Sequence, residues 1–176
     1  LTDTAAFALQ FVGPPYVFSL RQVGSNCGLI GKHAVTYSNG ITYWMSNEGG
    51  FFAYDGTVKS IPCLVEDFVF NNNDNTVGIN YDASEIVYSS HNTLHSEINW
   101  FYPSKDSLQI DRVVTYNYEE QTWVTGTLAR STYADSAVYS NPQATQYTRA
   151  AAGTFPTVQG LTTDVNSDYF VGSSIY

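Results

Sequence analysis

The sequence predicts an all-β protein made of short antiparallel strands, and three observations lead to this fold class. Charged residues make up only 13% of the chain and aromatic residues 15%, which favours strands and turns over surface helices. Short aromatic and β-branched runs alternate with turn signals, of which Asn39-Gly40 is the strongest. The stretch 98–123, INWFYPSKDSLQIDRVVTYNYEEQTW, holds two such runs and their turns, and a further strand begins at its end. Polar turns between aromatic strand ends are typical of one sheet in a repeated all-β structure.

The length and charge of the chain limit its functions. Its 176 residues suit a single β-rich domain or part of a larger one. The net charge is −9, with only 7 Lys and Arg, whereas a DNA-binding surface needs basic residues to displace counterions from phosphates. The acidity therefore disfavours binding to nucleic acids and to anionic membranes. It is compatible with a channel whose wall repels DNA and lets it slide.

The ends of the chain and its cysteines carry further expectations. No apolar run approaches the ~20 residues that span a bilayer, and the first residues, LTDTAAFALQF, lack the pattern of a signal peptide. Because the chain begins without Met and inside a strand-like pattern, we expect a piece of a longer protein. Cys27 and Cys63 are too few for a disulfide framework, so buried free thiols are expected, with a single bridge as the alternative.

The first part of the chain predicts a hairpin and then one compact sheet. Strands at 4–11 and 17–23 flank Gly13-Pro14-Pro15, where consecutive prolines force a bend. Four short strands with tight turns follow, at 34–37, 41–45, 51–54 and 57–61. Together they form a meander, over 34–61, of the size of one β-propeller blade. After Pro62, helical spacing of apolar residues predicts a short inserted helix near 64–70.

A second blade-like unit is expected over 85–129. Beyond a candidate strand at 77–81, its strands are predicted at 85–89, 97–102, 110–118 and 123–129. Trp44 aligns with Trp100, and the YDG turn at 54–56 aligns with 116–118. The two tryptophans lie farther apart than a usual blade of ~40–50 residues because the helix is inserted. The sequence therefore predicts a degenerate repeat.

The remaining part, 130–176, is less regular and rich in Ser, Thr and Gly. Strands are predicted at 133–139, 155–161 and 168–176, and 143–152 is either a strand edge or a loop. We expect this part to depend on a neighbouring chain or on a missing C-terminal segment.

Two groups of residues suggest chemistry at first sight. His91 and His95 have a spacing that holds a metal on a helix, but they are expected in a polar turn at 90–95 without a third ligand, as solvated histidines. The carboxylates of Asp106, Asp111 and the pair 119–120 resemble an acid–base set for glycoside cleavage. Exposed turn carboxylates are the expected alternative, since nothing in the sequence indicates a cleft or a raised pKa.

Two loops and one cysteine are also weighed and rejected as sites. The Asn/Asp run at 71–75 lacks the spacing of a calcium loop. The loop 24–31, GSNCGLIG, has no GK[ST] and precedes a strand, so it is not a phosphate loop. No His is placed to activate Cys27. We therefore predict no catalytic, cofactor-binding or metal-ligating residues, no cofactor, and a protein that is not an enzyme.

The tryptophans leave two interpretations open. Trp44, Trp100 and Trp123 either pack within and between sheets or form an exposed surface on which sugars stack. Their burial favours a structural protein, whereas an exposed aromatic row favours a lectin-like, carbohydrate-binding β-domain of a tail fibre or a secreted protein.

Five short motifs follow one another along the chain: CGL at 27–29, YWM at 43–45, YDG at 54–56, IPCLVEDFVF at 61–70 and WFYPS at 100–104. In this order they resemble a family of tailed-bacteriophage tail or virion structural proteins. The family pattern runs through a CGL.GP.A turn, a YWM strand, a YDG turn, an LPC.V.DYVF helix and E..WFYPS…D.YV.YNY…W..G.L.R. The matching stretches are 3–35, 41–71 and 97–130, and the likeness covers roughly residues 3 to 142. Lys32-His33 stand where the pattern tends to carry Pro, and Ile61 replaces Leu before Pro62.

The resemblance implies a β-propeller-like subunit, similar to the nozzle or tail-tube hub of short-tailed phages. Such a subunit is expected in the phage tail of the virion, after assembly in the host cytoplasm. It would form a ring with copies of itself, bind other tail proteins such as adaptors or fibres, and line the channel through which DNA leaves without specific binding. The resemblance implies no membrane contact and transfers no catalytic residues.

Overall fold

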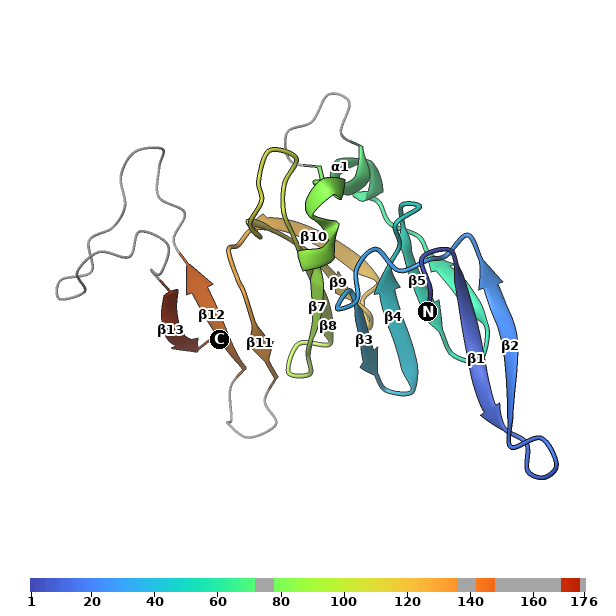
Figure 1. Ribbon diagram of the computed structural model, residues 1–176. Coiled ribbons are helices and arrows are strands. Elements are labelled where there is room, and N and C mark those ends of the chain that lie inside the picture. Colours follow the sequence, from blue (N-terminus) through green and yellow to red (C-terminus); the bar gives the residue numbers. More distant parts are fainter. Residues whose placement is uncertain (72–77, 136–141, 148–168, 175–176) are drawn as a thin grey trace.

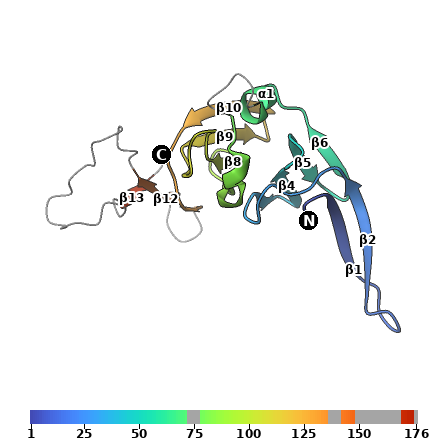
Figure 2. The ribbon, with the colours of Figure 1, turned by 45° about the horizontal axis from the view of Figure 1, so that its top comes forward.

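The computed structural model describes residues 1–71, 78–135, 142–147 and 169–174, and their regular secondary structure is mostly antiparallel β-sheet (Figure 1). Four sheets follow each other along the chain: a two-stranded hairpin, two four-stranded sheets and a three-stranded sheet. The predicted all-β class is therefore confirmed. The described sheets do not close into a ring (Figure 2).

The hairpin consists of β1 (Ala5–Phe11) and β2 (Phe18–Ser25). The pairing is antiparallel, and its register shifts once, between Ala6 and Phe7. Both strands were expected from their apolar runs. The hairpin lies at one end of the molecule and projects beyond the sheet that it packs against (Figures 1 and 2).

The first four-stranded sheet is a meander, with each strand beside the next. Its strands are β3 (Val35–Ser38), β4 (Ile41–Met45), β5 (Phe51–Tyr54) and β6 (Val58–Ile61). The β3–β4 turn is formed by Asn39 at φ 50° and Gly40 at φ 84°. These two residue types tolerate positive φ, which is why the sequence predicts this hairpin correctly.

The second four-stranded sheet has the same meander order. Its strands are β7 (Tyr88–Asn92), β8 (Glu97–Tyr102), β9 (Arg112–Asn117) and β10 (Thr122–Thr127). The predicted acidic turn separates β9 from β10. There Asn117 Oδ1 accepts hydrogen bonds from the backbone N–H groups of Glu119 and Glu120 at 3.0 and 2.9 Å.

The segment between the two meanders contains helices where the sequence predicts one helix and two strands. The predicted helix is present as α1 (Glu66–Phe70). The strand predicted at 77–81 is wrong over its described residues, which hold an isolated bridge at Ile79, and the one predicted at 85–89 is displaced. A 3₁₀ helix, η1 (Tyr81–Ile86), occupies this segment because the Asn80 side chain accepts a hydrogen bond from the Asp82 N–H at 3.0 Å. Strand β7 therefore starts at Tyr88 and continues into the predicted turn 90–95.

The third sheet lies at the other end of the molecule and is formed by β11 (Tyr133–Ala134), β12 (Gln143–Tyr147) and β13 (Tyr169–Ser174). The edge strand predicted at 168–176 is confirmed over the bounds of β13. Within 143–152, which was left open as a strand edge or a loop, the structure has β12, and it is the middle strand of this sheet. The strand at 133–139 is confirmed for its first two residues, and its continuation and the strand at 155–161 lie outside the described residues.

The main core lies between the two four-stranded sheets. The first sheet contributes Tyr43, Met45 and Phe51, and the second contributes Trp100 and Val114, all buried. The indole N–H of Trp100 crosses to the first sheet and donates to the Ala34 carbonyl at 3.2 Å. Burial of this aromatic layer is the main apolar contribution that holds the two sheets together.

The other face of the first sheet packs against the hairpin in a related way. Trp44 is buried against Ala6 and Cys27, and its indole N–H donates to the Cys27 carbonyl at 2.8 Å. Trp44 and Trp100 both stand on the second strand of a meander. Their acceptors, Cys27 and Ala34, both lie in the segment between β2 and β3.

Candidate functional site

The apolar face of the β1–β2 hairpin is the most extensive candidate surface. Five large side chains on it are between 39% and 68% exposed: Phe7, Leu9, Phe11, Phe18 and Leu20. We call this set the apolar hairpin face. Leu9 pairs with Leu20 and Phe11 with Phe18, and paired residues of an antiparallel ladder project to the same side. The Phe11 and Phe18 rings meet edge to face with centroids 5.8 Å apart.

The opposite face of the same hairpin is small and polar instead of apolar. Gln10 pairs with Ser19, and Ala8 pairs with Arg21. These residues are small, polar or charged, so the hairpin is amphipathic, with period 2. In globular proteins the apolar face of such a ribbon is normally buried, whereas here it lies on the surface.

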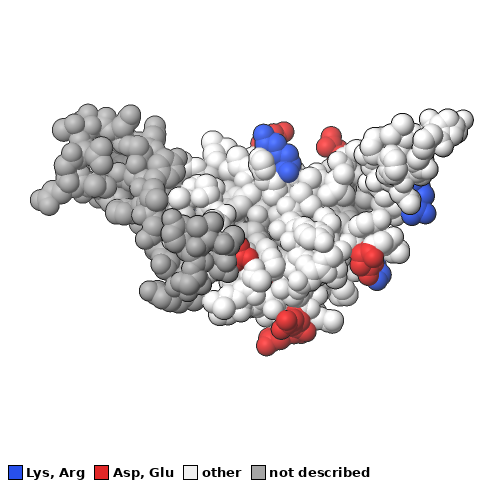
Figure 3. Space-filling model, turned by 90° about the horizontal axis from the view of Figure 1, so that it is seen from below, with Lys and Arg blue, Asp and Glu red and all other residues white. Residues whose placement is uncertain are grey.

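A contiguous exposed apolar patch on a protein marks an interaction site. The tip extends the apolar hairpin face, because Val12, Tyr16 and Val17 are also exposed. Figure 3 shows that charged side chains on the face seen there are few and separated by uncharged surface. The hairpin is therefore suited to contact with another protein.

A polar cluster around His91 joins three parts of the chain. His91 lies on β7, where its Nε2 is 3.0 Å from Ser38 Oγ and 3.2 Å from Tyr118 OH. Its Nδ1 is 4.0 Å from Asp135 Oδ2. The prediction of a solvated turn residue is wrong for His91, because β7 extends into 90–92, whereas His95 is exposed in the turn as expected.

The residue types of this cluster are those of a hydrolase triad. Ser38, however, is only 3% exposed. Its hydroxyl oxygen is therefore shielded from a substrate. The geometry instead ties β3, β7 and the start of the third sheet together. No local sequence pattern indicates this cluster, because Ser38, His91 and Asp135 come from distant segments.

The His91 cluster predicts a pH dependence of stability. Desolvation lowers the pKa of His91 from its ordinary value of 6.5, and the nearby Asp135 opposes this shift. The unfolded chain therefore binds a proton more readily than the native chain, and stability falls as pH decreases below about 6.5. We expect His91→Gln to reduce this decrease in urea titrations between about pH 5 and 7.

The matched control is His95→Gln, because His95 is an exposed histidine four positions away. It should keep the wild-type slope of unfolding free energy against pH. Equal slopes for the wild type and His91→Gln would contradict a partly buried His91 whose pKa is lowered by desolvation.

The predicted acid–base carboxylates occupy different environments. Asp106, Glu119 and Glu120 are exposed, as expected of turn residues. Asp111 is buried, and its two oxygens accept hydrogen bonds from Ser104 N and Ser104 Oγ, both at 2.7 Å. The expectation of an exposed carboxylate is thus wrong for Asp111. Its buried side chain links the two ends of the β8–β9 connection through the hydrogen bonds from Ser104.

Removal of the Asp111 carboxylate should destabilise the protein. Asp111→Ala leaves a buried backbone N–H and a hydroxyl of Ser104 without their acceptor, so we expect the free energy of unfolding to fall by about 3 kcal/mol. Asp106→Ala, in the same connection but exposed, should change it by less than about 0.5 kcal/mol. Equal urea midpoints for the two variants would show that the Ser104 contacts contribute little.

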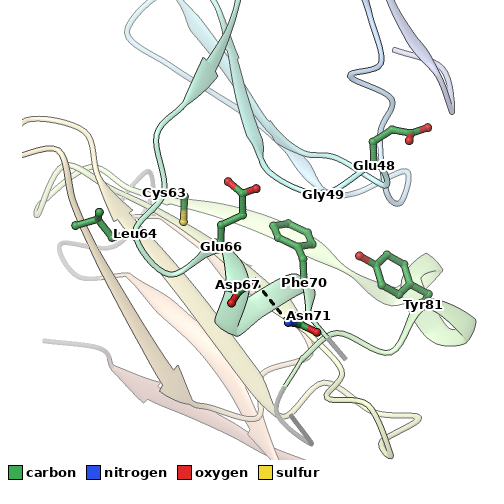
Figure 4. A pocket seen from close by; sticks show the side chains of 9 residues that line it. All are labelled: Glu48, Gly49, Cys63, Leu64, Glu66, Asp67, Phe70, Asn71 and Tyr81. Carbon is green, nitrogen blue, oxygen red and sulfur yellow. Dashed lines mark hydrogen bonds between the residues drawn. The ribbon is translucent and has the colours of Figure 1, made fainter. Parts of the chain in front are cut away.

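A cavity of about 500 Å³ lies beside α1. Figure 4 shows its lining, which includes the carboxylates of Glu48, Glu66 and Asp67 and the rings of Phe70 and Tyr81. Carboxylates and aromatic rings are groups that can hold a cation. Cys63 also borders the cavity, but burial raises its pKa to about 11, so the thiol is protonated at neutral pH and is a poor nucleophile.

Both cysteines are free. The predicted free thiols are therefore confirmed, although only Cys27 is fully buried. The loop 24–31 fixes the N-terminal segment: Cys27 N donates to the Thr4 carbonyl at 3.4 Å and Leu29 N to the Thr2 carbonyl at 2.9 Å. Of the run 71–75, Asn71 is described, and it ends α1. Over the described part of the chain, no three His, Cys, Asp or Glu side chains group as a metal site.

The three tryptophans are packing residues. Trp44 and Trp100 are fully buried. Trp123 is half-buried against Tyr116, with ring centroids 4.6 Å apart, and its indole N–H donates to the Pro62 carbonyl at 2.9 Å. They therefore form no exposed row on which a sugar could stack, which favours the structural interpretation over the lectin-like one.

Comparisons with protein-family models and with curated protein sequences found no match. Among the described residues, no helix is both long and apolar enough to span a membrane.

Proposed function

We propose that this chain is a structural component of a phage tail, similar to a nozzle or tail-tube hub. It works through protein–protein contacts and ring assembly, with other copies of itself and other tail proteins as partners. The observation that carries the proposal is the repeated packing of its meanders: each has a buried tryptophan on its second strand, and the indoles of Trp44 and Trp100 each donate to a carbonyl of the segment between β2 and β3. The link to phages rests on the sequence motifs of residues 3 to 142 that resemble the family of phage tail proteins.

The relative placement of the two meanders supports propeller-like blades. Their first strands, β3 and β7, lie side by side, and a parallel bridge links His33 to Tyr88. In a β-propeller, blades of four antiparallel strands are arranged radially around a central channel. The described part of the chain would then supply consecutive blades of a larger assembly.

The charge supports a role at a channel for DNA. The chain has a net charge of −9, so a channel wall made from it would repel the phosphates of DNA. Proteins that hold DNA use basic residues to displace counterions from the phosphates, and this chain has few basic residues. We propose that acidic residues dominate the channel-facing side. A map of the assembled tail with a basic lumen would refute this part.

Localisation in particles tests the proposal. Antibodies against the purified chain should label the tail of phage particles from its source, and peptides of the chain should be recovered from purified virions. Recovery from the cell extract alone would contradict a virion role. Specific binding of the purified chain to a glycan array would instead support a carbohydrate-binding domain.

A further inference from the structure

We infer that the β3–β4 turn, formed by Asn39 and Gly40, is a site of spontaneous deamidation whose product loosens the packing of β3. Both turn residues are exposed, and both have positive φ, 50° for Asn39 and 84° for Gly40. The turn lies at the end of the first meander that is remote from α1 (Figure 1). Because Gly40 has no side chain, nothing on this residue shields its backbone nitrogen from the neighbouring Asn39 amide.

The surroundings of the turn leave the reacting atoms accessible. The β3–β4 ladder ends with the pair Ser38 and Ile41, so the Gly40 N–H lies beyond the last paired residues. Among the described residues other than its chain neighbours, none has an atom within 4 Å of the position that a Cβ would occupy at Gly40. The turn can therefore change its backbone dihedrals without meeting another part of the chain, and water can reach the Asn39 amide.

The reaction is balanced with water as its co-reactant. The Gly40 backbone nitrogen loses its proton to water or hydroxide and attacks Cγ of Asn39, so an N–Cγ bond forms. The Cγ–Nδ2 bond breaks, and Nδ2 takes up a proton and leaves as ammonia. Water then opens the cyclic imide at one of its two carbonyl carbons. Cleavage of the new N–Cγ bond gives aspartate, and cleavage of the original peptide bond gives isoaspartate, in which the main chain runs through Cγ.

The isoaspartate product changes the packing of β3. It adds one methylene to the backbone of a two-residue turn, and the type of such a turn sets the register of the strands that flank it. Ser38 directly precedes the turn, is 3% exposed, and has its Oγ 3.0 Å from His91 Nε2. We expect the longer turn to displace Ser38 from His91, which weakens the tie between β3 and β7.

Other asparagines of the described chain provide an internal comparison. Asn92 is 5% exposed, its Nδ2 donates to Glu97 Oε2 at 3.2 Å, and Thr93 follows it. A β-branched residue crowds its own backbone nitrogen, and burial keeps water from the amide. Asn92 is therefore the matched control site within the same molecule.

Ageing of the purified, folded chain at physiological temperature in weakly basic buffer tests the site. Peptide mapping by mass spectrometry should show aspartate and isoaspartate at Asn39, formed at least ~10-fold faster than at the crowded Asn92. Asn39→Gly removes the amide and keeps a residue that accepts positive φ, so the aged variant should gain no negative charge at this turn. No conversion at Asn39, or conversion no faster than at Asn92, would overturn the inference.

A second measurement tests the effect on β3. Asn39→Asp has the charge of the deamidated chain but an ordinary backbone, so it separates the added charge from the added methylene. Amide hydrogen exchange in β3 should be at least ~3-fold faster in the isoaspartate-containing fraction of the aged wild type than in Asn39→Asp. Equal exchange in these two forms would overturn the displacement of Ser38.

Discussion

Trp100→Ala is expected to lower the free energy of unfolding by about 4 kcal/mol, because a fully buried indole at the centre of the core is replaced by a methyl group. Trp100 is 0% exposed, packs against Phe51 with ring centroids 4.8 Å apart and the planes tilted by 48°, and donates to the Ala34 carbonyl. The substitution therefore removes apolar contacts and leaves the Ala34 oxygen without its indole donor. Urea denaturation followed by circular dichroism measures the loss.

Two variants calibrate this result. Trp100→Phe keeps an aromatic ring but not the N–H, so about half of the loss is expected. Leu108→Ala removes a side chain that is 78% exposed and should cost less than about 0.5 kcal/mol. A Trp100→Ala variant as stable as Leu108→Ala would show that the two meanders do not pack through this residue.

Gly28→Ala is expected to destabilise the protein by about 3 kcal/mol or more, because backbone occupies the space that a Cβ needs. A Cβ at Gly28 would overlap the Asp3 carbonyl and stand 2.6 Å from Thr4 N. No side-chain rotation relieves a backbone contact, so the N-terminal segment has to move. Hydrogen exchange should show faster exchange in β1, with a lower melting temperature of the whole protein.

The control for this substitution is Gly126→Ala on β10. There the nearest neighbour of a Cβ is a side-chain atom, Val113 Cγ1 at 3.3 Å, which can shift. A change below about 1 kcal/mol is expected. If Gly28→Ala behaved like Gly126→Ala, the N-terminal segment would not be packed on the loop 24–31 as described.

Local sequence signals predicted most of the fold. The Asn39-Gly40 turn, the break at Pro62 and the aromatic run of β8 each act within a few residues, so their strands and the helix α1 were found. The segment 80–87 was misjudged because the Asn80 side chain stabilises a 3₁₀ turn that competes with a strand. The displacement of β7 and the misplacement of His91 follow from this one local competition.

The candidate surface was only partly predictable. The strands β1 and β2 were predicted on either side of Gly13-Pro14-Pro15, but a strand pattern does not tell whether an apolar face is covered. The burial of Asp111 and the meeting of Ser38 with His91 depend on contacts between distant segments. The aligned positions of Trp44 and Trp100, by contrast, could be predicted because each follows the same turn-and-strand order.

A cryo-electron microscopy map of the assembled tail is the most direct test of the structural role. We expect several copies of the chain around the tail axis, with acidic residues toward the channel. A map in which the chain is missing from the tail, or in which basic residues line the channel, would contradict this structural role.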